Sequence, residues 1–210
     1  MRQIWKLPEP ASLTQYRCTP GSNYKGYRDK PILREQLARE QRGLCCYCLS
    51  RIRPGNPGEL PRMKIAHWHS RHLHEDEDLD YSNLLGACMG NQGNPPNLQH
   101  CDTRQGDRDI KWNPAIPDHQ IESRIRYLPD GTIVSDDAEF NAQINEILNL
   151  NIAFLVNNRK AVFDSFKHSL EGSPSWVRLL REWNGESQEG ELTEYCQIVV
   201  CWLRKRLARP

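Results

Sequence analysis

The stretch "GLCCYCLSRIRPGNPGELPRMKIAHWHS", residues Gly43 to Ser70, carries most of what the chain reveals about its fold and chemistry. It begins with a cysteine knuckle, passes through a turn rich in Pro and Gly, and reaches a histidine after an apolar segment. Cys45 and Cys48 have C-x-x-C spacing, which lets a tight turn present both sulfurs to one Zn²⁺. Residues 50–52 and 63–68 are predicted to form two short strands joined by this turn.

A tetrahedral zinc site needs two further ligands, and the chain offers them downstream. Cys88 and Cys101 are the best candidates, separated by a loop rich in Gly, Asn and Pro. His100 could replace Cys101 as the fourth ligand, and Cys46 could substitute locally. The simpler alternative is a set of buried cysteines that share no ion. A closed site with four cysteines is structural rather than catalytic.

Composition limits the cellular context and the class of partner. The 210 residues include 28 basic and 27 acidic side chains, so no strong overall field draws the chain onto nucleic acid. A local basic surface or a partner would have to hold such a substrate. No apolar run is long enough to cross a membrane, and the N-terminus lacks a secretory signal, so we expect a cytoplasmic protein. In that reducing compartment, clustered cysteines indicate metal ligands rather than disulfides.

Helical and strand signals alternate along the rest of the chain. After an irregular lead over residues 1–30, a helix is predicted from Pro31 to a stop at Gly43. Around the Asp130-Gly131 pair, alternating apolar residues predict a β-hairpin. A helical pattern then begins near 135, where Asp136 and Glu139 have capping-box spacing, and continues to 166.

Two more helices are predicted near the C-terminus, one opened by Ser173-Pro174 and one over 192–207. Trp176, Trp183 and Trp202 on these helices fit either core packing or a face that docks a partner. The fold class is therefore α+β, with an N-terminal helix and a C-terminal helical layer. The predicted organisation is a zinc-braced region over 1–115 and a hairpin with helices over 116–210.

His67 is the candidate for acid–base chemistry, because a neutral imidazole is the side chain best suited to accept a proton near pH 7. A single histidine after a strand is more often a packed or surface residue. The further histidines His69, His72 and His74 also permit a metal-binding interpretation. The acidic tract HEDEDLD at 74–80 is interpreted as a solvated loop rather than a metal site.

The order of motifs resembles a known nuclease superfamily. C-x-x-C at 45–48, I-x-H-W at 65–68, D-Y-x-N-L-L-G-A-C at 80–88 and H-C-D-x-x-x-G-D at 100–107 are similar to the HNH endonucleases. Within that superfamily, the chain resembles most the Septu-type, retron-associated HNH endonucleases (PtuB-like). The Y-x-x-D-G-x-I hairpin at 127–133 extends the similarity, which covers about residues 30–170.

The resemblance implies an HNH ββα-metal nuclease core, in which two strands and a helix surround one catalytic divalent ion and a zinc braces them. His67 matches the general base, and Asn83 matches the central Asn that organises the loop and orients the base. Asp102 matches the last motif position, a metal ligand on the helix. Oxygen ligands of this kind suit Mg²⁺ or Mn²⁺. Asp107 is a lesser candidate that matches no motif position.

Three features depart from the family pattern. Ala66 stands where relatives have Asp or Glu, so one ligand to the catalytic ion is absent. The ion could be held by other groups, or activity could be weak or dependent on a partner. The third alternative is that the domain binds without catalysing cleavage. The insert GNQGNPPNLQH between Cys88 and Cys101 is longer than in compact relatives. Gln105 stands where many relatives have Lys.

The resemblance implies a metal-dependent endonuclease that hydrolyses phosphodiester bonds in DNA or RNA, tRNA included, as an effector of bacterial antiphage defence. Relatives are encoded beside an ABC/SMC-like ATPase (PtuA-like) and in some cases a retron reverse transcriptase with its multicopy single-stranded DNA. The alternative is a catalytically weak or inactive zinc-stabilised adaptor or nucleic-acid-binding subunit. The best candidates for phosphate contacts are Arg124, Arg126, Arg159 and Lys160.

Overall fold

The computed structural model describes residues 1–56, 58–170, 172, 174–187 and 189–208, and its architecture is α+β, as predicted. Its α-helices are α1 (Ala11–Arg17), α2 (Lys30–Glu40), α3 (Cys101–Gln105), α4 (Ile121–Arg124), α5 (Ala138–Ala142), α6 (Ala153–His168), α7 (Trp176–Asn184) and α8 (Gln197–Leu207). Its strands are β1 (Lys64–His67), β2 (Leu84–Ala87), β3 (Arg126–Tyr127) and β4 (Ile133–Val134). Short turns of 3₁₀-helix are η1 (Glu75–Glu77), η2 (Tyr81–Asn83), η3 (Pro96–Leu98) and η4 (Pro117–His119), and η5 (Gln143–Ile147) is a π-helical turn.

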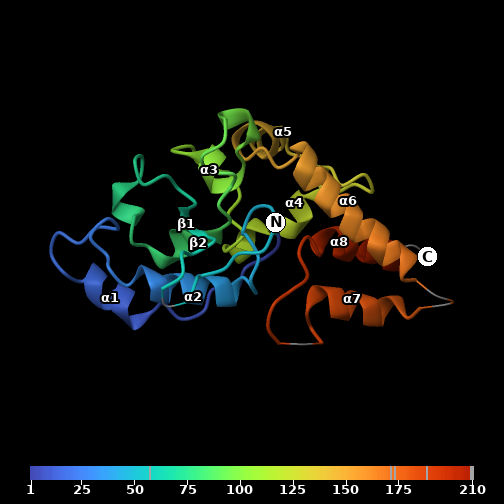
Figure 1. Cartoon of the computed structure of the whole chain (residues 1–210), viewed down its shortest axis with the longest axis horizontal. Helices are drawn as coiled ribbons and strands as arrows, with labels where there is room; N and C mark the ends of the chain where they lie inside the picture. The colour runs from blue at the N-terminus through green and yellow to red at the C-terminus, as the bar shows by residue number, and fades with distance from the viewer. Residues whose placement is uncertain (57, 171, 173, 188, 209–210) are drawn as a thin grey trace.

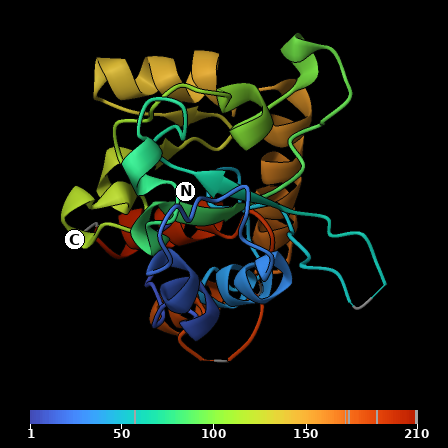
Figure 2. The same ribbon diagram turned by 90° about the vertical axis from the view of Figure 1, so that its left-hand side faces the viewer.

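The centre of the fold is the antiparallel pair β1–β2. Lys64 lies opposite Ala87 and His67 opposite Leu84. All four residues of β2 are buried, while α3 packs against β1 and α2 packs against β2. Figures 1 and 2 both show α1 and α2 below this strand pair. Figure 1 places α6, α7 and α8 together on the right-hand side of the view, away from α1.

The partner of β1 differs from the one predicted. Residues 50–52 do not form a strand; the segment makes only isolated bridges, Leu44 with Arg51 and Arg53 with Arg62. The reason is local: the Ser50 carbonyl accepts from the Cys45 N–H at 2.9 Å, which closes the cysteine turn instead of a sheet. The predicted turn at 54–58 includes Pro57, which lies outside the described residues.

Helix α2 confirms the predicted helix, with Pro31 in its first turn. It ends where Arg42 and Gly43 both adopt left-handed backbone, with φ of 53° and 74°. The Gly43 N–H donates to the Ala38 carbonyl at 2.8 Å, which satisfies a carbonyl of the last turn. Gly suits this position because it lacks the Cβ that makes positive φ costly.

The hairpin β3–β4 is confirmed, but the single helix predicted over 135–166 is interrupted. It forms α5, the π-helical turn η5 and then α6, with left-handed backbone at Asn149 (φ 49°). The Asn151 side chain pairs with the backbone N–H and carbonyl of Ile133 at 2.9 and 2.8 Å, which ties the break to β4. The N-cap is Asp137 rather than Asp136, and it accepts from the Phe140 N–H at 3.0 Å.

The last two helices also begin later than predicted. Ser175 caps α7, and the predicted start at Ser173 lies outside the described residues. Helix α8 begins at Gln197 rather than 192, because Tyr195 has left-handed backbone with φ of 56°. The tryptophans of these helices pack against the core, with the Trp176 and Trp202 rings 5.7 Å apart.

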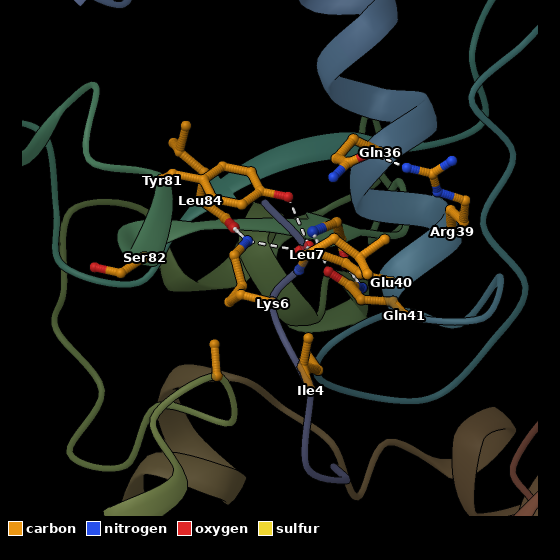
Figure 3. Close-up of polar contacts among 12 residues, drawn as sticks. Ile4, Lys6, Leu7, Gln36, Arg39, Glu40, Gln41, Tyr81, Ser82 and Leu84 are labelled. Atoms are coloured by element: carbon orange, nitrogen blue, oxygen red, sulfur yellow. Dashed lines mark hydrogen bonds and ion pairs between the residues drawn. The ribbon is translucent and has the colours of Figure 1, made fainter. Parts of the chain in front are cut away.

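The N-terminal lead is attached to the core by a buried polar network, shown in Figure 3. The lead is less irregular than predicted, since it contains α1. The fully buried carboxylate of Glu40 accepts from Lys6 Nζ at 2.6 Å, the Tyr81 hydroxyl at 2.6 Å and the Leu7 N–H at 3.1 Å. This network joins the lead to α2 and to the turn before β2.

The predicted division at residue 115 stays a prediction, and several hydrogen bonds cross it. The Met1 amine contacts the Tyr127 hydroxyl, and the Gln3 N–H donates to a Glu122 carboxylate oxygen at 3.1 Å. The Leu192 N–H donates to the Arg42 carbonyl at 3.0 Å, which connects the chain before α8 to the end of α2. Within the described residues, no helix has the length and apolar character needed to span a membrane.

Candidate functional site

The structure brings Cys45, Cys48, Cys88 and Cys101 together in one buried cluster. Their sulfur atoms all lie within 4.8 Å of one another. The sulfurs of Cys45 and Cys101 are 3.9 Å apart, and those of Cys48 and Cys88 are 3.7 Å apart. Two thiolates at about 2.3 Å from one tetrahedral Zn²⁺ lie about 3.8 Å apart. The cluster could therefore hold a structural metal such as zinc.

Three parts of the fold supply these cysteines. The knuckle carrying Cys45 and Cys48 is joined to β2 through the Cys46 N–H, which donates to the Gly86 carbonyl at 3.0 Å. Cys88 follows β2 directly, and Cys101 is the first residue of α3. An ion bound by all four would therefore connect the knuckle, the central strand and the helix.

The two alternative ligands are close but do not belong to the cluster. The Nδ1 atom of His100 lies 3.1 Å from the Cys101 sulfur and 4.0 Å from that of Cys88. The group whose ligand atoms gather contains Cys101 and not His100. Cys46 is buried beside it and is likewise outside the group. The geometry therefore favours Cys101 as the fourth ligand.

The thiols of the cluster share their protons unequally. Burial opposes the charge of every thiolate here, but hydrogen bonds from neighbouring thiols hold the pKa of Cys45 well below its usual range. Burial alone would raise the pKa of Cys48, but hydrogen bonding to Cys101 outweighs it and lowers the pKa to about 6. Burial raises the pKa of Cys101. Because metals bind thiolates, a bound dication would displace the protons that remain.

His67 lies at the end of β1 with only 8% of its surface exposed. Its Nε2 lies 3.0 Å from the Asp78 carbonyl. Because a carbonyl can only accept, Nε2 carries the proton and Nδ1 keeps its lone pair. The Tyr24 ring meets the imidazole edge-on at 4.5 Å. Burial, together with the positive charge of Arg71, lowers the pKa of His67 to about 4, so the ring is neutral at pH 7.

Asn83 is buried and acts on the loop that follows His67. Its Oδ1 accepts from the His69 N–H at 2.7 Å, and its Nδ2 donates to the carbonyls of His69 and Glu77 at 3.1 and 3.2 Å. Glu77 precedes Asp78, whose carbonyl accepts from the His67 ring. Asn83 can therefore position His67 through this loop, without touching the imidazole itself.

Asp102 lies in the first turn of α3, and its Oδ2 is 3.5 Å from Lys64 Nζ. Burial raises the pKa of Asp102, and the charges of Lys64 and Arg71 oppose that rise. In the part of the chain described, no group of three or more metal-ligand side chains includes Asp102 or His67. One carboxylate already paired with a lysine does not by itself form a divalent-ion site. Asp107 is exposed beyond α3.

The two residues that depart from the HNH pattern, Ala66 and Gln105, are both buried here. Ala66 is fully buried in β1 opposite Leu85. Gln105 is also buried: it accepts from the Tyr47 hydroxyl at 2.5 Å and donates to the Trp68 carbonyl at 3.2 Å. Gln105 therefore links α3 to the end of β1 and is not placed to contact a phosphate.

The basic residues predicted to contact nucleic acid interact with other groups of the protein. Arg159 is fully buried and donates to the carbonyls of Gly131 and Leu150, so its burial removes it from the candidate contacts. The remaining three lie at partly exposed or exposed positions but have partners: Arg126 pairs with Asp136, Lys160 pairs with Asp164, and Arg124 stacks on Trp112.

A different group of cations lies near Tyr24, whose ring contacts His67. Lys30 Nζ lies 4.8 Å and the Arg71 guanidinium 4.9 Å from the centre of the Tyr24 ring. After burial, the positive charges of Arg34, Arg28 and Arg71 are what lower the pKa of Lys30, so these cations lie near one another. The Tyr24 N–H donates to Asp78 at 2.8 Å, which holds the loop between α1 and α2 beside the loop between β1 and β2 (Figure 1).

These four basic residues (Arg28, Lys30, Arg34 and Arg71) form no ion pair with any carboxylate in the described residues, and we call them the Tyr24 cation group. Position in the sequence did not reveal the group, because Arg71 is far from the other three along the chain. Its members are brought together only when the two loops meet.

Comparison with known proteins adds no family assignment: no protein-family model and no curated protein matches the chain. The functional conclusion therefore rests on the residues and their geometry.

Proposed function

We propose that this chain is a metal-dependent HNH-type endonuclease that hydrolyses phosphodiester bonds in DNA or RNA. The observation that carries the proposal is the arrangement at His67, where a neutral imidazole donates from Nε2 to Asp78 and contacts Tyr24, next to the Tyr24 cation group. A base that activates water and cations that stabilise negative charge both accelerate hydrolysis of an anionic ester. The motif order and the cluster of four cysteines support the same proposal.

In this proposal, His67 Nδ1 accepts the proton of the attacking water while Nε2 holds the ring against Asp78. The low pKa of His67 ensures that the base is unprotonated at pH 7, and a phosphate nearby would stabilise the imidazolium that forms. The Tyr24 cation group would hold the phosphate backbone. A divalent ion such as Mg²⁺ or Mn²⁺ would stabilise charge on the phosphate and the leaving oxygen; Asp102 is the one oxygen ligand that the motif offers, so water and the substrate phosphate would have to supply the others.

The finer biological proposal is that the chain is an effector of an antiphage system of Septu or retron type. Its partners would be an ABC/SMC-like ATPase (PtuA-like) and, in the retron form, a reverse transcriptase with its multicopy single-stranded DNA. The near-neutral charge of the chain, 28 basic against 27 acidic residues, fits a nuclease whose partner supplies part of the grip on the substrate.

The experiment is cleavage of plasmid DNA and of total tRNA with Mg²⁺ or Mn²⁺, with and without the ATPase. His67→Ala is compared with His72→Ala, which alters an exposed histidine on the same loop. We expect His67→Ala to lower the rate about 10²–10⁴-fold, the usual contribution of general base catalysis, and His72→Ala to leave it unchanged. Equal cleavage rates for the two variants would show that His67 is not the general base.

The second candidate function is a zinc-stabilised adaptor or nucleic-acid-binding subunit. Ala66 supplies no ligand, and the pairing of Asp102 with Lys64 favours this candidate. It predicts no cleavage of either substrate by the folded, zinc-loaded chain with its ATPase. It also predicts that His67→Ala retains binding to the partner and to nucleic acid.

A further inference from the structure

A second group of metal-ligand side chains lies on the loop that follows β1. One ligand atom from each of His69, His74 and Glu77 falls within 4.8 Å of the others. Nδ1 of His69 is 2.7 Å from a Glu77 carboxylate oxygen, and the rings of His69 and His74 are 4.9 Å apart. Two ligands bound at about 2.1 Å to one ion lie roughly 3.0–4.2 Å apart, so binding requires only small side-chain movements.

Asp109 adds a fourth polar group next to these three. Its Oδ2 lies 2.7 Å from Nε2 of His74, and its Oδ1 accepts from the Ser70 N–H at 2.8 Å. A carboxylate in this position can either bind the ion or fix the tautomer of a histidine that binds through its other nitrogen. In either role Asp109 would support metal binding by His74.

The backbone that carries these ligands is held in place by the fold. Asn83 binds the His69 N–H and the Glu77 carbonyl, and the His74 N–H donates to the Ser70 carbonyl at 2.8 Å. The ordering cost of bringing the ligands together is therefore largely met before an ion arrives. The side chains themselves are partly exposed, which gives an ion access from solvent.

We propose that His69, His74 and Glu77 form a second metal site, distinct from the four cysteines, that takes a divalent first-row transition ion such as Zn²⁺ or Co²⁺. Imidazole with carboxylate selects such ions, whereas Mg²⁺ prefers a shell of oxygen ligands. The site does not require the chain to be a nuclease. Its ion would brace the Glu77–Asp78 segment, whose Asp78 carbonyl orients His67.

The test is metal titration of the folded full-length chain, first stripped of metal and then reloaded with zinc or with Co²⁺. We expect two equivalents per chain. Co²⁺ at the cysteine cluster gives intense thiolate charge-transfer absorption, and Co²⁺ at the second site adds weaker absorption without it. Glu77→Gln keeps a hydrogen-bonding group beside His69 but loses the charge, and His74→Ala removes an imidazole. Each should weaken the second equivalent at least about tenfold and leave the thiolate bands unchanged.

His72→Ala is the matched control, because His72 lies on the same loop but outside the group. It should bind both equivalents as the unaltered chain does. A single equivalent in the unaltered chain would overturn the proposal. So would a second equivalent of unchanged affinity in both Glu77→Gln and His74→Ala, since the ion would then be bound elsewhere. Circular dichroism of each variant shows that the chain remains folded.

Discussion

At the scale of single residues, His67 combines burial with a single hydrogen bond to a carbonyl. Water stabilises a charged imidazole far better than this environment does, which is why the pKa falls from 6.5 to about 4. A pKa of about 4 in the folded state and an ordinary value in the unfolded state make stability depend on pH. Between these two values only the unfolded chain takes up the proton.

The unfolding free energy should therefore fall as the pH drops from 7 through 6.5 toward 4, and be unaffected by His67 above 6.5. The expected loss is about 2–3 kcal/mol at pH 4.5, because about two pKa units of the shift lie between 6.5 and that pH, at about 1.4 kcal/mol each. Urea unfolding of the parent and of His67→Gln at pH 7 and pH 4.5 measures it, because glutamine does not titrate. The same loss in His67→Gln would show that other groups cause it, and His72→Gln controls for an exposed histidine.

Residue identity predicted that the four cysteines gather, but it did not distinguish the buried Arg159 from a surface cation. Thiolate ligands must converge on one small ion, so their spacing in the sequence is informative, and Cys45, Cys48, Cys88 and Cys101 do gather. An arginine has no comparable constraint. Arg159 satisfies its guanidinium with main-chain carbonyls in the core, and nothing in its sequence neighbours distinguishes it from a surface cation.

At the scale of elements, the cysteine cluster connects the knuckle, β2 and α3. Cys46 offers a matched control, because it is buried in the same knuckle but outside the cluster. Cys48→Ala should remove one equivalent of zinc and lower stability by about 3 kcal/mol or more, roughly 6–12 °C in midpoint temperature. Cys46→Ala should cost only about 1 kcal/mol and retain the zinc. Metal analysis with thermal unfolding makes the comparison; equal metal loss in both would place Cys46 among the ligands.

The loop between β1 and β2 depends on Asn83 in a similar way. Asn83→Ala removes three hydrogen bonds and leaves the buried partners without replacements, so we expect a loss of about 2–4 kcal/mol. The His69 amide hydrogen should then exchange with solvent faster than in the parent. The amides of α8 should keep the same ranking of exchange rates among themselves. Hydrogen exchange followed by residue measures this. Unchanged protection at His69 would mean that Asn83 does not hold the loop.

The sequence predicted which segments are regular more reliably than it predicted their partners and ends. The strand at β1 follows from its apolar pattern, but its pairing with β2 across 16 intervening residues depends on tertiary contacts that no short pattern encodes. The break between α5 and α6 was missed because Asn149 and Asn151 sit inside a helical apolar repeat. Their side-chain bonds to other segments override that repeat.

At the scale of the whole molecule, the buried Glu40 network determines how the N-terminal lead sits on the core. Glu40→Ala leaves Lys6 without its carboxylate in a largely buried position, so we expect a loss of about 3–5 kcal/mol. Replacing both partners, Lys6→Met with Glu40→Met, should cost less than Glu40→Met alone, because no uncompensated charge remains. Urea unfolding of the single and double variants tests this. A double variant that is the sum of its singles would show that the pair does not interact.

The charge of the whole molecule is nearly balanced, at 28 basic and 27 acidic residues, so nucleic acid should bind where cations lack acidic partners. The Tyr24 cation group meets this condition, while Arg126 is paired with Asp136. Arg28→Gln with Arg71→Gln should weaken binding to single-stranded and duplex oligonucleotides at low salt. It should also reduce the slope of log affinity against log salt by about 1–2, since each lost phosphate contact removes about 0.7–0.9. Arg126→Gln should leave the slope unchanged. Fluorescence anisotropy over a salt series measures both, and a slope that changes only in Arg126→Gln would move the nucleic-acid contact from the loop beside His67 to the β3–β4 hairpin.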